Sequence, residues 1–475
     1  MNTPPLVVDL DGTLLRSDLL VESGFAFIRR HPARSLMPLK WLLSGKATLK
    51  TRLASEIALD IPSLPFNKGV IAFLRQAKAE GRSLILATAS PQRYADEIAR
   101  HLGLFERVLA THGDINLSAR AKRDLLVREY GEKGFDYLGN SADDLAVWQA
   151  ARHAYLVNPE LGVEARATRL GNVARVIRSS PSDPWRPWLK QLRAHQWLKN
   201  LLIFVPLLAS HQISHPDLLI RGLLAFFVFG LCASSVYLLN DLLDLEDDRQ
   251  HSTKRTRPLA AGTVSIKAAL LVCPALLMGG FAGATWLLPR EFTLALTCYY
   301  ALTLAYSLVL KRIMTVDVIT LAMLYTMRIV AGVFAFDVVL TFWMLAFSMF
   351  LFLSLALVKR YAELREARTE GKNEVTPGRG YYPADLEMIA SLGTASGLLS
   401  VMVLALYIQD RSTLALYRHP QVIWLACPLL LYWVTRIWMV THRGWMHEDP
   451  VVFAMKDRNS LIIAILFAIV FWAAS

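Results

Sequence analysis

Apolar and polar positions follow two different patterns along the chain. Up to residue 158, apolar segments of strand length alternate with amphipathic helical stretches. After residue 197, long apolar runs recur with few charged residues inside them. The first pattern is typical of an α/β domain, and the second is typical of membrane-spanning helices.

The apolar segments of the first part predict the strands of a parallel sheet. They lie at residues 6–14, 83–90, 107–111, 136–141 and 154–158. The helical stretches between them indicate an open, doubly wound α/β sheet, which binds ligands at the carboxyl ends of its strands. Residues 16–75 are helical in pattern and basic, which predicts a helical cap or a face that rests on anionic lipid.

The apolar runs of the second part predict an all-α polytopic membrane domain. The runs lie at residues 198–211, 218–240, 266–288, 291–310, 315–335, 338–358, 387–409, 420–441 and 459–474. Since about 20 apolar residues cross a bilayer as a helix, we expect about nine transmembrane helices, of which the first and last are short. The predicted domains are 1–180 and 197–475, joined by a linker and interfacial helix at 181–196.

The distribution of basic residues predicts the orientation in the membrane. Lysines and arginines are concentrated in loops 241–265, 311–312, 359–379 and 443–458, whereas loops 212–217 and 336–338 contain none. The positive-inside rule therefore places the basic loops in the cytoplasm. No signal peptide is indicated, so we expect a bacterial inner-membrane protein with its N-terminal domain and active sites on the cytoplasmic side. The net charge of +12 fits this topology and phosphorylated substrates, and nothing further supports nucleic-acid binding.

A polar cluster at the end of the 218–240 run predicts a metal-bound diphosphate. Its members are Asn240, Asp241, Asp244 and Asp248. The three aspartates share one face of a helix, and their charges oppose the helix dipole unless a cation joins them. Oxygen ligands without Cys or His suit Mg²⁺, and Lys254, Arg255 and Arg257 then provide partners for phosphate. The alternative is a solvated loop whose bases only set the topology.

The N-terminal segment DLDGTL, residues 9–14, and the order of later polar residues resemble the haloacid dehalogenase superfamily over about residues 5–178. The resemblance implies that Asp9 is the nucleophile, that Asp11 is the general acid and base, and that Thr88 and Lys122 bind phosphoryl oxygens. It implies an Mg²⁺ site formed by Asp9, Asp11, Asn140 and Asp144. Such chemistry is reasonable, because a carboxylate attacks phosphorus only when a metal and a lysine neutralise the phosphate.

The fourth motif of this domain departs from the family pattern. The family usually has GDxxxD, whereas this chain has GNSADD, so Asn140 retains an oxygen but lacks a charge. Asp143 is a candidate for compensation. The alternative to an active phosphatase is a domain that only supports the membrane part.

The motif NDxxDxxxD, followed by HSTKRTRPLAAG, resembles the UbiA superfamily of intramembrane prenyltransferases over about residues 190–475. Within it, the chain is most similar to the decaprenyl-phosphate phosphoribosyltransferase branch, because YSLVLKRIMTVD stands where aromatic prenyltransferases have DxxxD. The resemblance implies that Asp241 and Asp244 are catalytic metal ligands, together with Asn240 and Asp248. It implies phosphate-binding roles for Lys254, Arg257, Tyr306, Lys311, Lys359 and Arg360.

The resemblances imply one reaction sequence and leave two alternatives. The expected enzyme uses Mg²⁺ to transfer 5-phosphoribose from phosphoribosyl pyrophosphate to polyprenyl phosphate, and its N-terminal domain is a candidate for removing the 5-phosphate. One alternative is an aromatic prenyltransferase acting on an acid such as 4-hydroxybenzoate, and the other is a transporter or lipid-binding protein with a regulatory phosphatase domain. For Lys311 and Arg328, the alternatives are a snorkelling lysine and an Arg328–Asp317 pair. His447, Glu448, Asp449 and Asp457 receive no role, and the oligomeric state is not indicated.

Overall fold

The computed structural model describes all residues except 1–2, 113–115, 180–184, 252–253, 372–379, 411–416, 447–448 and 475. The predicted boundary at residue 180, and His447 and Glu448, lie outside the described residues. The chain forms two compact units: Met1–Leu192 with Tyr237–Cys273, and Arg193–Val236 with Pro274–Ser475. The acidic segment at 240–248 therefore belongs to the same unit as the N-terminal sheet.

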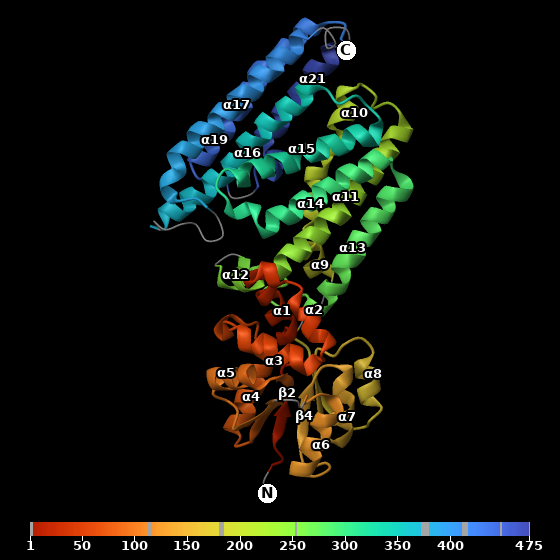
Figure 1. The fold of residues 1–475 in the computed structure, drawn as a ribbon, viewed down its shortest axis with the longest axis vertical. Coiled ribbons are helices and arrows are strands. Elements are labelled where there is room, and N and C mark those ends of the chain that lie inside the picture. Colours follow the sequence, from red (N-terminus) through yellow and green to blue (C-terminus); the bar gives the residue numbers. More distant parts are fainter. Residues whose placement is uncertain are drawn as a thin grey trace. The chain divides into compact units, whose positions relative to one another are not determined.

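The first unit contains a six-stranded parallel sheet, which confirms the predicted α/β architecture (Figure 1). The strand order is β3-β2-β1-β4-β5-β6. The strands are β1 (Leu6–Val8), β2 (Leu84–Pro91), β3 (Arg107–Thr111), β4 (Asp136–Gly139), β5 (Ala154–Val157) and β6 (Val173–Ile177). The last of these was not predicted, because its side chains are only half-buried or exposed and its apolar pattern is correspondingly weak.

Helices cover both faces of the sheet, which explains the continuous apolar run of β1. Leu6 and Val8 pack with α4 (Lys68–Ala79) and α5 (Gln92–Leu102) on one face. Val7 packs into the other face, which is covered by three helices. They are α6 (Ala119–Tyr130), α7 (Leu145–Ala150) and α8 (Val163–Thr168).

The segment 16–75, predicted to be helical, contains three helices between β1 and α4, which we refer to as the cap. They are α1 (Leu19–Arg30), α2 (Met37–Leu43) and α3 (Lys46–Glu56). Asp18 begins α1, since its carboxylate accepts hydrogen bonds from the N–H groups of Leu20 and Val21. The first helix of the cap therefore starts only a few residues after the polar segment that follows β1.

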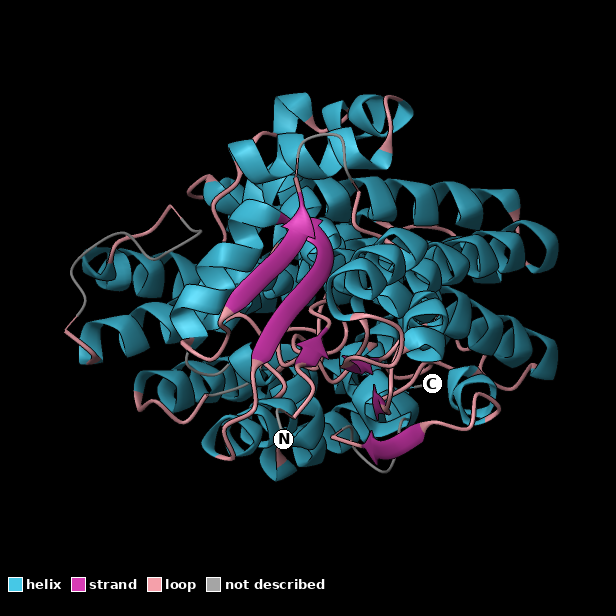
Figure 2. Cartoon of the chain, turned by 90° about the horizontal axis from the view of Figure 1, so that it is seen from below, coloured by secondary structure: helices cyan, strands magenta, loops and turns pink. Residues whose placement is uncertain are grey.

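Helices form most of the rest of the chain (Figure 2). They are α9 (Trp185–Gln191), the 3₁₀ segment η4 (Ala194–Phe204), α10 (Val205–Ala209), α11 (Pro216–Leu243), α12 (Leu245–Gln250), α13 (Ile266–Leu287), α14 (Arg290–Leu308), α15 (Val316–Phe336), α16 (Phe342–Thr369), α17 (Leu386–Gln409), α19 (Ala426–His442), α20 (Pro450–Lys456) and α21 (Arg458–Ala474). Short 3₁₀ turns η5 (Lys254–Thr256) and η6 (Leu310–Arg312) lie in two of the basic loops.

Within the described residues, 6 helices are long and apolar enough to cross a membrane. They begin at Pro216, Ile266, Val316, Phe342, Pro383 and Pro420, and the bent pair of α20 and α21 would be a further span. The expected count of nine is not confirmed. The run 198–211 forms η4 and α10 rather than one long helix, and it buries the polar Lys199 and Asn200. Another predicted span, α14, contains tyrosines and threonines and is not among these helices.

Candidate active sites

The carboxyl end of β1 carries Asp9, which lies beside a buried lysine. Lys122 belongs to the first turns of α6, and its Nζ atom donates a hydrogen bond of 2.7 Å to Asp9 Oδ1. Both side chains are buried, and burial raises the pKa of Asp9 to about 6 against the opposing charge of Lys122. The pair thus combines a carboxylate with a cation that can neutralise an incoming phosphate.

Asp11 is held by groups from two other elements. Ser90 Oγ, near the end of β2, donates to Asp11 Oδ2 over 2.5 Å, and the N–H of Leu19 donates to Oδ1 over 2.8 Å. Burial and the nearby charge of Asp18 raise the pKa of Asp11 to about 7. The N–H of Ser90 also donates to the buried Thr88 Oγ1 over 3.0 Å. A carboxyl group that titrates near neutrality suits the general acid and base role predicted for Asp11.

The loop after β1 packs directly against Asn140, which follows β4. Thr13 Oγ1 lies 3.2 Å from Asn140 Oδ1 and 3.4 Å from Asp9 Oδ2. Gly12 has a φ of +79°, and a Cβ atom at this position would lie 2.5 Å from Asn140 Nδ2. Only glycine fits both the conformation and the space. The fold therefore brings the loop after Asp9 into contact with the predicted fourth motif.

Asp144, a predicted metal ligand, closes the turn after β4. Its Oδ2 atom accepts hydrogen bonds of 2.9 Å from the N–H groups of Asn140 and Ser141. Its Oδ1 atom accepts a hydrogen bond of 2.8 Å from the Tyr137 hydroxyl, to which Lys122 also donates over 2.8 Å. Asp144 is thus connected to Asp9 through Tyr137 and Lys122.

The polar groups at this edge of the sheet offer oxygen ligands. They include the carboxylates of Asp9 and Asp144 and the amide oxygen of Asn140, a set that fits Mg²⁺. Asp143, the candidate for compensation, is exposed. In the described part of the chain, no three His, Cys, Asp or Glu side chains are grouped closely enough to hold a metal ion by themselves. An amide, a water molecule or a substrate oxygen would therefore have to complete the ligand set.

The acidic segment forms a second polar cluster in the same unit. The helix is broken at Asp244, because α11 ends directly before it and α12 begins directly after it. The prediction of one continuous helical face is therefore wrong. Asp241 and Asp248 nevertheless converge, since Arg257 Nη1 donates to Asp241 Oδ1 over 3.1 Å and to Asp248 Oδ2 over 2.6 Å. Both aspartates are only 2% exposed.

Two amide side chains hold this cluster in place. Gln191 Nε2 donates to Asp241 Oδ2 over 2.8 Å, and Gln191 Oε1 accepts from the N–H of Leu259 over 3.0 Å. Asn240 Nδ2 donates to Asp244 Oδ2 over 3.1 Å. The ligands are again oxygen atoms, and buried carboxylates that share a guanidinium also suit a divalent cation. The cluster therefore fits Mg²⁺, although Arg257 bridges carboxylates in this arrangement.

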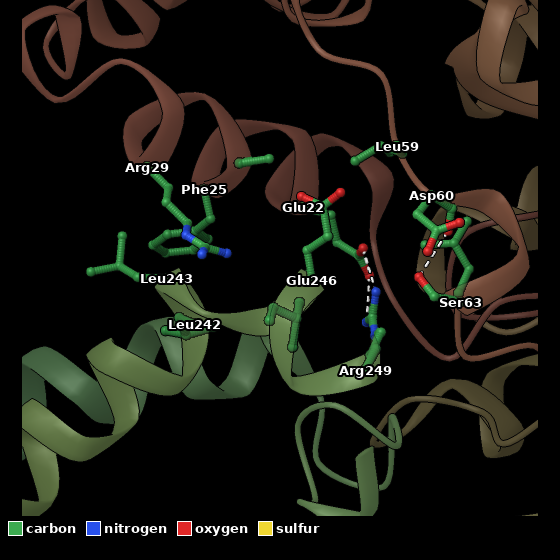
Figure 3. A pocket seen from close by; sticks show the side chains of 13 residues that line it. Glu22, Phe25, Arg29, Leu59, Asp60, Ser63, Leu242, Leu243, Glu246 and Arg249 are labelled. Carbon is green, nitrogen blue, oxygen red and sulfur yellow. Dashed lines mark hydrogen bonds and ion pairs between the residues drawn. The ribbon is translucent and has the colours of Figure 1, made fainter. Parts of the chain in front are cut away.

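A buried ion pair connects the phosphatase-like cap to the acidic segment. Figure 3 shows Glu22 of α1 facing Arg249 of α12, and the two guanidinium nitrogens lie 2.7 and 2.8 Å from the carboxylate oxygens. Arg249 Nε also donates to the carbonyl of Ala260 over 3.1 Å. Arg29 forms an ion pair with Asp247, and its Nε atom lies 4.0 Å from Asp244 Oδ1. The Glu22–Arg249 pair thus fixes α1 against the helix that follows Asp244.

Replacing Glu22 with Gln is expected to lower the thermal stability of the purified protein. The substitution leaves Arg249 buried without its carboxylate, and breaking a buried pair costs about 3–5 kcal/mol. Scanning fluorimetry should show a clear fall in the unfolding midpoint. Arg34→Gln is the control, because the partly exposed Arg34–Glu56 pair is worth less than about 1 kcal/mol. Exchanging the charges, with Glu22→Arg and Arg249→Glu together, should recover part of the loss. Equal midpoints for Glu22→Gln and the wild type would contradict this account.

The second unit contains a buried cluster around Asp449, which begins α20. Lys199 Nζ lies 2.7 Å from Asp449 Oδ2, and Lys359 Nζ lies 3.5 Å from the same atom. The Tyr325 hydroxyl lies 3.0 Å from both carboxylate oxygens. Two ammonium groups around one carboxylate form an environment that suits an additional anion such as phosphate. This cluster includes Lys359, a predicted phosphate-binding residue.

Arg328, within α15, forms hydrogen bonds with polar groups other than Asp317, the partner that the sequence analysis considers for it. It donates to Asn200 Oδ1 over 3.2 Å, to the Tyr299 hydroxyl over 3.0 Å and to the Leu324 carbonyl over 2.6 Å. Asp317 instead forms an ion pair of 2.7 Å with Arg360. The proposed Arg328–Asp317 pair is therefore not the arrangement in the structure.

Arg360 lies in a structural ion-pair network. It is 1% exposed and contacts the carboxylates of Asp317 and Glu363, while the Tyr306 hydroxyl donates to Asp317 over 2.8 Å. This environment favours a structural role for Arg360 over the predicted phosphate contact. Two other predicted phosphate-binding residues are more accessible: Lys254 is exposed in η5, and Lys311 is half-buried in η6.

Replacing Arg360 with Met should destabilise the second unit, since it removes the guanidinium that forms an ion pair with the buried Asp317 carboxylate. We expect a cost of about 3–5 kcal/mol, measured as a lower unfolding midpoint in detergent. The double variant with Asp317→Asn should be more stable than the single one, because no charge is then buried alone. Arg368→Gln, which removes an exposed pair with Glu387, is the control. A stable Arg360→Met protein with a raised KM would instead support the phosphate contact.

Some of these site residues were missed by the sequence analysis. They are Thr13, Ser90, Tyr137, Lys199 and Asn200. A signal was present for Lys199, because a lysine inside a predicted apolar run is expensive and usually functional. The sequence assigns no role to Asp449, because no residue near it in the sequence identifies Lys199 as its partner.

Comparisons with known proteins identify a family for each of the two parts of the chain. Residues 201–461 match the UbiA prenyltransferase family, and residues 6–149 match the haloacid dehalogenase-like hydrolases. The chain is 38% identical over 469 residues to the uncharacterized protein y4nM of Sinorhizobium fredii, covering 98% of this chain and 90% of that protein. It is 30% identical over 307 residues to the decaprenyl-phosphate phosphoribosyltransferase of Mycolicibacterium smegmatis, covering 63% of this chain and 95% of that enzyme.

Among solved structures, the chain is similar to a UbiA homolog from Archaeoglobus fulgidus bound to GPP and Mg²⁺. The TM-score is 0.46 and the sequence identity is 19%, and the match covers 61% of this chain and 99% of that one.

Proposed function

Because the chain belongs to the UbiA prenyltransferase family and carries an N-terminal haloacid dehalogenase-like domain, we propose that it is a bifunctional enzyme of polyprenyl-phosphate ribose synthesis. The membrane domain transfers 5-phosphoribose from phosphoribosyl pyrophosphate to polyprenyl phosphate, and the N-terminal domain removes the 5-phosphate. The observation that carries the proposal is the match to nearly the full length of a decaprenyl-phosphate phosphoribosyltransferase, together with buried aspartates at the acidic motif.

The transferase step needs a stabilised leaving group more than it needs a base. Asn240, Asp241, Asp244 and Asp248 would hold Mg²⁺, which neutralises pyrophosphate when it is bound. Arg257, which already contacts two of these carboxylates, would turn to the pyrophosphate oxygens. The bond from C1 to pyrophosphate then breaks as C1 develops oxocarbenium character, and a lipid phosphate oxygen forms the new bond. That oxygen is ionised at neutral pH, so no general base is required.

The second unit contains basic residues of its own, for which the family resemblance implies phosphate-binding roles. Lys199 and Lys359 lie around Asp449, and we assign Lys359 and Lys311 to substrate phosphates as the family resemblance implies. The protein is a multi-pass membrane protein. We place both active sites at the cytoplasmic face of a bacterial inner membrane, as the basic loops indicate.

In the phosphatase step, Asp9 attacks the phosphorus of the 5-phosphate while Lys122 neutralises the phosphoryl oxygens. Asp11 donates its proton to the departing 5-oxygen of the ribose, and it then accepts a proton from the water that hydrolyses the aspartyl-phosphate. Asp9, Asn140 and Asp144 would hold Mg²⁺, which supplies additional charge neutralisation when it is bound. Asn140 contributes a neutral oxygen, so this site carries one negative charge fewer than the family pattern.

The proposal is tested with membranes that contain the protein and one of two substrate mixtures. One mixture is radiolabelled phosphoribosyl pyrophosphate with polyprenyl phosphate, and the other is a labelled prenyl diphosphate with 4-hydroxybenzoate. We expect labelled lipid in the first mixture only, with loss of labelling on chelation of Mg²⁺ and recovery when Mg²⁺ is added. A product in the second mixture only would identify an aromatic prenyltransferase. Ligand binding without turnover in either mixture would support a transporter or a lipid-binding protein.

A further inference from the structure

A lysine of the phosphatase cap lies at the edge of the site and has no role in the reaction proposed above. Lys50 lies on α3, and its Nζ atom donates to the carbonyl of Ala89 over 2.7 Å and lies 3.4 Å from Asn116 Oδ1. Ala89 stands in β2 between Thr88 and Ser90. The ammonium group of Lys50 is therefore anchored one residue away from a predicted phosphate-binding group and from the partner of Asp11.

The charge of Lys50 is placed differently from that of Lys122. Lys122 contacts the carboxylate of Asp9 directly, so it serves the phosphoryl group that is transferred. Among the described residues, Lys50 forms hydrogen bonds with two neutral oxygen atoms. Its side chain is half-buried, and burial lowers its pKa while the charges of Asp11 and Asp18 oppose that shift. A partly desolvated ammonium with neutral partners interacts strongly with an anion that approaches it.

The cap supplies a second base near this one. Lys46 lies one turn earlier on α3 and is exposed, so the two ammonium groups lie on neighbouring positions of one helical face. Like charges at this spacing repel each other, and an anion between them relieves that repulsion. The catalytic loop and the cap thus present two separate cationic positions, one for the monoester and one for another anionic group.

We propose that Lys50 binds a second anionic group of the phosphatase substrate, namely a phosphate on the same sugar as the phosphate that is cleaved. The domain is then selective for ribose 5-phosphates that carry a phosphodiester or phosphate at C1, over simple phosphomonoesters. This inference rests on the proposed function, whose transferase product has a 5-phosphomonoester and a C1 phosphodiester to the lipid. The other role for Lys50 is a tether between the cap and the sheet, which would affect every substrate equally.

The test compares two soluble substrates with the full-length protein in detergent. Release of the 5-phosphate from ribose 1,5-bisphosphate and from ribose 5-phosphate is followed by phosphorus NMR. We expect the wild type to prefer the bisphosphate in kcat/KM. Lys50→Gln should lose about tenfold on the bisphosphate, mainly through KM, and less than about twofold on ribose 5-phosphate. Lys50→Arg should retain the preference, and Lys40→Gln on α2, an exposed lysine of the same cap, should match the wild type.

Three results would overturn the inference: equal losses on both substrates in Lys50→Gln, no preference in the wild type, or no hydrolysis of either substrate. These assays do not use the membrane reaction. A retained preference for the bisphosphate in a protein that does not label lipid from phosphoribosyl pyrophosphate would therefore contradict the proposed transferase alone.

Discussion

Replacing Asp241 with Asn is expected to reduce ribose transfer to lipid by about 10²- to 10³-fold, because it removes one of two buried charges that meet at Arg257. The isosteric amide retains the volume of the side chain, so the loss should reflect charge rather than packing. The measurement is the initial rate of lipid labelling from phosphoribosyl pyrophosphate at several Mg²⁺ concentrations. A weaker metal site should also raise the Mg²⁺ concentration needed for half-maximal rate.

The same helix provides a matched control for this variant. Asp217 lies in the first turn of α11, at the opposite end from Asp241, and it is exposed. Asp217→Asn should label lipid at the normal rate. The phosphatase rate of Asp241→Asn on ribose 5-phosphate should also be unchanged, which shows that the unit is folded. Normal labelling by Asp241→Asn would rule out a metal-bound diphosphate at this motif.

Replacing Asp9 with Asn should abolish phosphate release, with a loss of about 10³-fold or more, because the amide cannot form the aspartyl-phosphate. Lipid labelling should continue, since Asp9 belongs to the other chemistry. The labelled lipid should then retain its 5-phosphate. This accumulation is measured by mass spectrometry of the lipid fraction after incubation with phosphoribosyl pyrophosphate.

The control for Asp9→Asn is Asp124→Asn, which changes an exposed residue of α6 near Lys122. It should leave phosphate release intact. An Asp9→Asn protein that still dephosphorylates the lipid product would show that the N-terminal domain acts on another substrate or only supports the membrane part. The two variants therefore separate the two reactions within one polypeptide.

The acidic segment at 240–248 belongs to the same compact unit as the N-terminal domain, so removing that domain is expected to affect the segment. α1 contributes the N–H of Leu19 to Asp11 at its start, and it holds Arg249 through Glu22 one turn later. The cap of the phosphatase-like domain and the segment after Asp244 are thus joined by a buried pair. A deletion of residues 1–180 would expose Arg249, and we expect the remaining membrane part to be less stable than the full chain.

Features that depend on neighbouring residues can be read from the sequence alone. Alternating apolar segments specified the parallel sheet, and DLDGTL placed Asp9 and Asp11 at the end of β1. These patterns are readable because side-chain periodicity and turn chemistry act over a few residues. The apolar content likewise identified membrane-spanning helices, although not their number, since the run 198–211 forms η4 and α10 rather than one long helix.

Which distant charges meet becomes visible only in the folded chain. Glu22 and Arg249 are 227 positions apart, and Lys199 and Asp449 are 250 positions apart. The break at Asp244, the pairing of Arg360 with Asp317 and the approach of Lys50 to β2 also arise from packing between elements. A buried charge must find a partner, but its local sequence does not say which one, because that choice depends on the path of the whole chain.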